Sequence, residues 1–71
     1  MQQKEIEHMQ VRLFQYACNK WGIGIQRSAE LFDFFQVDQY IEEMYEFFHV
    51  QGDMTNLEEI EQYLRSKGVE I

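Results

Sequence analysis

The clearest pattern of hydrophobic and polar positions lies between Val37 and His49. On a helical wheel, at about 100° per residue, its apolar side chains fall in one arc roughly 160° wide. They are Val37, Tyr40, Ile41, Met44, Tyr45, Phe47 and Phe48. A helix that packs on one side needs an apolar stripe only a little wider than about 100°. We therefore predict that residues 38–50 form the central helix of a small bundle, with Met44 almost fully buried.

Three further helices are predicted by apolar residues that recur at steps of three and four positions. They span about 3–21, 25–36 and 56–67. Gly22 is expected to end the first helix and Gly68 the last, because glycine adopts the left-handed C-cap conformation without a Cβ penalty. The buried side of the second helix is expected to carry Ile25, Ala29, Phe32 and either Phe35 or Gln36, with Leu31 adjacent.

The helix starts are predicted from residues that can cap free backbone N–H groups. Asp38 directly precedes the apolar run of the central helix and is expected to be its N-cap. Thr55 and Glu58 have the spacing of a capping box, in which the two side chains bond reciprocally to the first turn. The last helix is therefore expected to begin just after Thr55.

These elements predict one all-α domain over residues 1–71, a compact bundle of four short helices. No strand pattern competes, and 45% apolar and 15% aromatic residues suffice to attempt a core. The single cysteine, Cys18, excludes an intrachain disulfide and fits a reducing, cytoplasmic setting. No run approaches the roughly 18 apolar residues of a membrane span, and the charged N-terminus lacks a signal-peptide core.

Charge is distributed unevenly along the chain, which has a formal net charge of −7. Residues 28–64 carry ten acidic side chains and neither lysine nor arginine, whereas residues 1–27 have a net charge of +2. Such an acidic block repels nucleic acids and anionic lipids. We therefore expect no nucleic-acid or membrane partner, and instead a protein with a basic surface. A solvated acidic face that only keeps the protein soluble remains the alternative.

Surplus aromatic residues accompany this acidic block. Three helix faces cannot bury Phe14, Phe34 and Phe47 along with the other aromatic residues, and exposed aromatics beside acids are typical of protein-binding surfaces. The predicted partner-binding residues are Asp38, Glu42, Glu43, Glu46, Phe47 and His49. The leading hypothesis is a non-enzymatic protein-binding module. The alternative is a homodimer whose own seam buries the apolar surplus.

Metal and catalytic chemistry are not expected. Glu5 and His8, like Glu46 and His49, have the E-x-x-H spacing of di-iron helical bundles. However, the wheel places His8, Glu46 and His49 on solvated faces, whereas metal ligands in such bundles point inward. Cys18 has no histidine at helical spacing, and no phosphate-binding or nucleophile motif occurs. We predict no catalytic residues, no metal and no cofactor.

One run of motifs comprises Leu31-Phe32, Val37, Tyr40-Ile41, Tyr45, Phe48 to Gly52, Ile60 and Tyr63-Leu64. It resembles a known family of short, acidic bacterial proteins of unknown function, in which Leu and Thr stand at the positions of Phe48 and Val50. Its members are often encoded beside predicted ADP-ribosyltransferase-like toxins. The resemblance implies an antitoxin-like or accessory binding role without catalysis, and it supplies no site residues.

Overall fold

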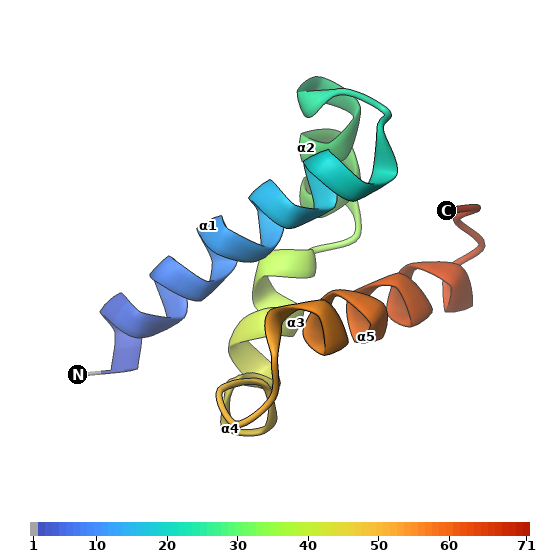
Figure 1. Ribbon diagram of the computed structural model, residues 1–71. Helices are drawn as coiled ribbons and strands as arrows, with labels where there is room; N and C mark the ends of the chain where they lie inside the picture. The colour runs from blue at the N-terminus through green and yellow to red at the C-terminus, as the bar shows by residue number, and fades with distance from the viewer. Residues whose placement is uncertain (1) are drawn as a thin grey trace.

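The computed structural model describes residues 2–71, and every regular element in them is helical (Figure 1). The elements are α1 (Gln2–Trp21), α2 (Ile25–Phe34), α3 (Val37–Glu43), α4 (Tyr45–Phe48) and α5 (Asp53–Ser66). Within these residues, four helices have seven residues or more, and α4 is a single turn of four. The predicted all-α class and compact bundle are confirmed. The predicted helix over 38–50 is wrong, because two helices occupy that segment.

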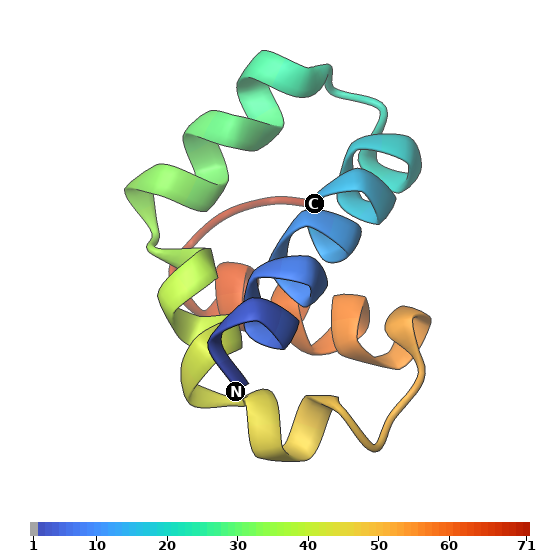
Figure 2. The same ribbon diagram turned by 90° about the vertical axis from the view of Figure 1, so that its left-hand side faces the viewer.

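The core is centred on α1, which packs against α2, α3 and α5 (Figures 1 and 2). Its apolar residues face inward at three- and four-residue steps, as an amphipathic helix requires. The buried core residues are Met9, Leu13 and Ala17 of α1, Phe32 of α2, Val37 and Ile41 of α3, Phe48 of α4, and Leu57, Ile60 and Leu64 of α5. The 37–49 stretch shares this central position, because it supplies the core residues Val37, Ile41 and Phe48 and because α3 packs against both α1 and α2.

Three residues expected to be buried lie nearer the surface: Met44, Ile25 and Ala29, the last of which is exposed on α2. Met44 is only half-buried, because it is the junction between α3 and α4 rather than the middle of one helix. Ile25 is 71% exposed, although it falls on the apolar side of α2. It is the first residue of that helix, beyond the reach of the core, and the buried positions of α2 are Ser28, Leu31 and Phe32.

The helix starts differ from the predicted caps. Gln36, in the left-handed conformation (φ 54°), precedes α3, and Asp38 lies inside that helix. α5 begins at Asp53 after Gly52, so Thr55 already belongs to its first turn and cannot cap it. Neither helix has a side-chain cap hydrogen bond. Both predicted caps are therefore wrong.

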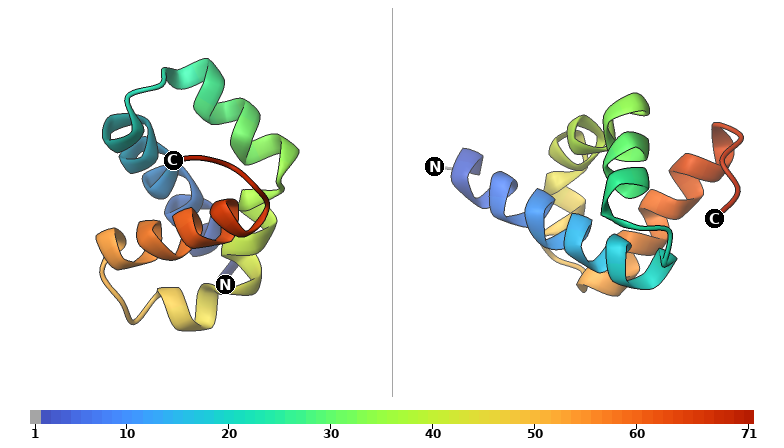
Figure 3. Two further views of the ribbon diagram at one scale, coloured as in Figure 1. Left: turned by 90° about the vertical axis from the view of Figure 1, so that its right-hand side faces the viewer. Right: turned by 90° about the horizontal axis from the view of Figure 1, so that it is seen from above.

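The predicted helix ends at glycines are confirmed. Gly22 directly follows α1 with φ of 65°, and Gly68 follows the end of α5 with φ of 93°. Around Gly68 the backbone N–H of Val69 donates to the Leu64 carbonyl (3.1 Å), and that of Gly68 donates to the Arg65 carbonyl (3.0 Å). This pair of bonds is the Schellman motif. It turns the last residues back across the bundle, so that Val69 and Ile71 pack against the core (Figure 3).

No helix in the described part of the chain is both long and apolar enough to cross a bilayer.

Candidate functional site

The residues predicted to bind a partner are all exposed, but they do not lie on one helix. Asp38, Glu42 and Glu43 belong to α3, Glu46 and Phe47 to α4, and His49 directly follows α4. The acidic face expected on one continuous helix is therefore divided. Asp38 and Glu42 still share a face of α3, because they are four residues apart in the same helix.

The division occurs at Met44, whose backbone (φ −94°, ψ 6°) leaves the helical region. No glycine, proline or capping residue marks this position in the sequence. The segment after it is held by α5 instead: the Asn56 side-chain amide donates to the Phe48 carbonyl (2.9 Å), and Gln51 donates to Asn56 (3.1 Å). These bonds hold α4 against the start of α5, so that α4 turns away from the axis of α3 (Figure 2).

An exposed apolar pair stands out on α4 and the turn after it. Phe47 is 65% exposed and Val50 is 74% exposed. The Val50 N–H donates to the Phe47 carbonyl (3.4 Å), so the two side chains lie on one side of a tight turn, where positions i and i+3 eclipse. The polar neighbours of this pair are Glu46 and His49, whose Oε1 and Nε2 atoms lie 3.8 Å apart. We call these four residues the α4 surface.

A pocket of about 420 Å³ opens between α1, α2 and the start of α3. Its apolar lining comes from Val11, Phe14, Ala29 and Phe32, and its polar lining from Glu7, Gln10, Asp33 and Asp38. The Phe14 and Phe32 rings meet edge to face, with centroids 5.1 Å apart. We call this depression the α1–α2–α3 pocket. Of its residues only Asp38 was predicted to bind, because the pocket depends on how three helices are placed.

Asp38 contributes both its carboxyl group and its backbone carbonyl to the polar contacts around this pocket. Partial burial raises the pKa of the Asp38 carboxyl above its usual range. Its backbone carbonyl accepts a hydrogen bond from the Gln10 side chain (2.8 Å), which ties the start of α3 to α1. Within residues 2–71, the side chains of Asp33 and Asp38 form no ion pair with a lysine or arginine.

A buried carboxylate, Glu61, has partners on both α1 and α5. It is 4% exposed, accepts a hydrogen bond from Trp21 Nε1 (2.9 Å) and lies 3.1 Å from Lys20 Nζ. Arg65 of the same helix approaches it to 3.9 Å. The burial of Glu61 was not predicted, because no local pattern in the sequence indicates it. Because every partner belongs to the fold itself, this cluster serves structure rather than ligand binding.

Tyr40 and Tyr63 connect α3 to α5. Their rings stack with centroids 4.2 Å apart, and the Tyr63 hydroxyl donates to the Phe35 carbonyl (2.7 Å). Burial, followed by the negative charge of Glu59, raises the pKa of Tyr40 above its ordinary value. Tyr40 therefore stays protonated at neutral pH and acts as a packing residue.

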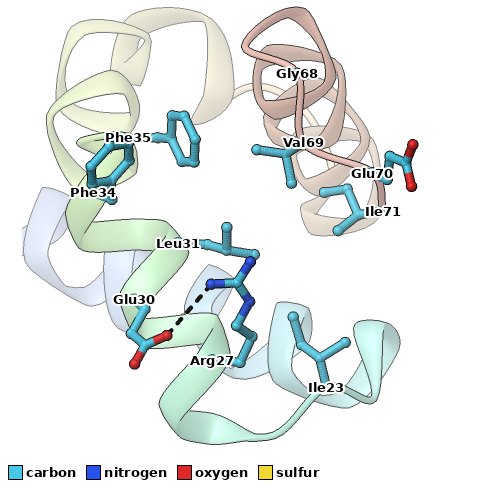
Figure 4. A pocket seen from close by; sticks show the side chains of 10 residues that line it. All are labelled: Ile23, Arg27, Glu30, Leu31, Phe34, Phe35, Gly68, Val69, Glu70 and Ile71. Atoms are coloured by element: carbon cyan, nitrogen blue, oxygen red, sulfur yellow. Dashed lines mark hydrogen bonds and ion pairs between the residues drawn. The ribbon is translucent and has the colours of Figure 1, made fainter.

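A larger groove of about 790 Å³ lies between α2 and the segment after α5 (Figure 4). Leu31 and Phe35 form one side of it and Val69 the other, while the Arg27 guanidinium points across it. Arg27 is already paired with Glu30 (3.5 Å). Because the charges of this groove are mixed and partly paired, they favour no particular class of ligand.

Three residues of the two E-x-x-H motifs line one depression on the surface. Glu5 and His8 of α1 line the same shallow depression as His49, and Arg12 lines it too. Even so, no group of three or more His, Cys, Asp or Glu side chains within residues 2–71 is placed to hold a metal ion. Cys18 is half-buried on α1, as its position on the wheel indicates.

Comparison with known proteins adds one finding. No curated protein and no solved structure matches the chain. Residues 5–67, which include all of the helices α2 to α5 and most of α1, match a family described as a protein of unknown function, DUF3791. The chain belongs to the DUF3791 family.

Proposed function

We propose that the chain is a non-enzymatic, cytoplasmic protein-binding module that engages a basic protein partner through the α4 surface and the neighbouring α3 carboxylates. The observation that carries this proposal is Phe47, an aromatic side chain 65% exposed beside Val50. Glu42 and Glu43 at the end of α3 supply further negative charge next to it in sequence.

This arrangement has the composition of a protein interface. Exposed aromatic residues commonly act as the anchors that carry most of the binding energy, and a polar rim surrounds them. A negatively charged rim steers a positively charged partner and raises the association rate. It also disfavours nucleic acid as the partner, since phosphates would be repelled.

The identity of the partner rests on the resemblance in the motifs from Leu31 to Leu64. Proteins with these motifs are often encoded beside predicted ADP-ribosyltransferase-like toxins. We therefore assign the chain an antitoxin-like or accessory role, in which it binds such a toxin without catalysing a reaction.

The test introduces a photo-crosslinking amino acid at position 47 and, as the control, at position 34. Phe34 is the matched control because it is also a strongly exposed phenylalanine, 78% accessible, but lies on α2. Crosslinking in the native host should recover a basic protein from position 47 and not from position 34. Equal recovery from the two positions, or none from position 47, would contradict the proposal.

Binding kinetics with the recovered partner then separate the two parts of the surface. Phe47→Ala should weaken affinity about tenfold or more, mainly through faster dissociation, while Phe34→Ala should not. Reversing Glu42, Glu43 and Glu46 to lysine should slow association and reduce its salt dependence. Light scattering of the chain alone provides a further check, because a concentration-independent dimer sealed by Phe47 would favour the homodimer instead.

A further inference from the structure

The α1–α2–α3 pocket combines an aromatic floor from α1 and α2 with carboxylates at the end of α2 and the start of α3. Phe14 and Phe32 provide the rings, while Asp33 at the end of α2 and Asp38 at the start of α3 contribute negative charge. Its volume, about 420 Å³, is within the range of roughly 300–1,000 Å³ typical of small-ligand pockets. No lysine, arginine or histidine lines it.

The partners already present in the structure leave this negative charge uncompensated. Glu7, on the α1 side, accepts a hydrogen bond from the Gln3 side chain (3.3 Å). Gln10 donates to the backbone carbonyl of Asp38, and therefore leaves the carboxylate of that residue free to accept from elsewhere. In the described part of the chain, neither Asp33 nor Asp38 has an ion-pair partner.

We propose that the α1–α2–α3 pocket receives an arginine side chain of the protein partner. The aliphatic part of that side chain would lie over Val11 and Phe14, and its guanidinium group would bind between Asp33 and Asp38. Arginine fits this combination better than lysine does. Its planar group stacks on aromatic rings and donates to carboxylates in a fixed fork, whereas an ammonium group is compact and strongly hydrated.

The pocket also extends the proposed interface. Asp38 lines the pocket, and Glu42 lies one turn further along the same face of α3. A basic segment that places one arginine in the pocket can therefore continue along α3. The inference depends on the proposed function only in assigning the arginine to a protein partner.

The test uses capped tripeptides as probes on the full chain, followed by NMR of the Val11 and Ala29 methyl groups. Acetyl-Gly-Arg-Gly-amide should produce saturable shifts of these methyl signals. The matching lysine peptide should bind at least about fivefold more weakly, and the citrulline peptide, which is neutral but has nearly the same shape, should bind less still. Equal binding of all three peptides, or shifts that never saturate, would overturn the proposal.

Two variants locate the binding. Asp33→Asn combined with Asp38→Asn should lower the arginine peptide's affinity at least about fivefold, whereas Glu42→Gln with Glu43→Gln, an equal change in net charge, should change it less than about twofold. Ala29→Leu should block the pocket sterically while leaving both carboxylates in place. If the two charge variants act equally, or if Ala29→Leu has no effect, the peptide only senses net charge and the pocket assignment fails. Crosslinking from position 47 does not depend on this result, so either proposal can fail alone.

Discussion

Two acidic residues of α5, Asp53 and Glu61, have cationic partners on α1, whereas those of α3 have none among residues 2–71. On α5, Asp53 accepts hydrogen bonds from Arg12 (2.9 and 3.3 Å), and Glu61 is paired with Lys20 (3.1 Å). In both cases α1 supplies the cation, 41 residues away along the chain. On α3, no carboxylate forms an ion pair with any lysine or arginine of residues 2–71.

This difference shows that the net charge of −7 is not spread evenly over the surface. The basic first third of the chain neutralises part of α5, whereas Asp33 and the carboxylates of α3 have no lysine or arginine partner among residues 2–71. Exposed ion pairs contribute little to stability, about 1 kcal/mol or less, so the Arg12–Asp53 pair mainly helps to align α1 with α5. The uncompensated carboxylates on α3 remain available to steer a partner.

The largest expected loss of stability comes from the buried side of α4, opposite the proposed binding residue Phe47. Phe48 is fully buried and is the buried residue of α4, whereas its neighbour Phe47 is exposed. Phe48→Ala should reduce the free energy of unfolding by about 3–5 kcal/mol, because it removes a large side chain and leaves a cavity. Urea denaturation followed by circular dichroism measures this loss.

Phe47→Ala is the matched control for that measurement. The same chemical change at an exposed position should alter the free energy of unfolding by no more than about 0.5 kcal/mol. Similar losses for the two variants would mean that Phe47 is part of the packed structure. In that case α4 would not divide into a buried residue, Phe48, and an exposed binding residue, Phe47.

A smaller loss in the free energy of unfolding is expected from Glu61→Ala in α5, where the carboxylate has partners on α1. This substitution leaves the Trp21 N–H without its acceptor and should cost about 1–3 kcal/mol. Glu42→Ala, on the uncompensated side, should change stability by no more than about 0.5 kcal/mol. Urea denaturation monitored by Trp21 fluorescence compares them, and equal losses would refute the proposed division of the acidic residues.

Much of the fold follows from local sequence patterns. The three-to-four spacing of α1 predicts its buried face, and the wheel of the 37–49 stretch places Val37, Ile41 and Phe48 in the core, as observed. The argument that a short chain cannot bury all its aromatics predicts the exposure of Phe14, Phe34 and Phe47. Phe34 and Phe47 are exposed, but Phe14 is half-buried and packs against the core. These features depend on the helical repeat and on chain length, which the sequence contains directly.

The features that sequence patterns missed depend on contacts between distant segments. The break at Met44 has no local signal, because the segment after it is tied to α5 by Asn56. Glu61 is buried because residues 40 and 41 positions earlier provide its partners. The α1–α2–α3 pocket exists only once three helices are placed together. The exposure of the proposed binding residues was therefore predictable from the sequence. The break that divides them between two helices was not predictable, and neither was the pocket beside them.

The smallest expected change in stability concerns a single carboxyl group of α3, that of Asp38. Two influences oppose each other there: the start of α3 favours a negative charge, whereas partial burial disfavours it. The raised pKa of Asp38 shows that burial prevails. The folded chain therefore holds this proton at pH values where the unfolded chain has released it. By linkage, ionised Asp38 costs stability at neutral pH, and this cost disappears as the pH falls through the raised pKa towards the ordinary value of 3.8.

Asp38→Asn should accordingly stabilise the chain at pH 7, by no more than about 0.5 kcal/mol because the residue is largely accessible. The gain should shrink as the pH is lowered and vanish below pH 3.8, where the carboxyl is protonated in both the folded and the unfolded chain. Glu42→Gln makes the same change in net charge one turn along the same face, so the difference between the two variants isolates the local effect of burial. Thermal unfolding at a series of pH values measures both. If Asp38→Asn instead destabilises the chain at pH 7, the carboxylate already has a stabilising partner within the fold, and α3 is not the uncompensated side of the molecule.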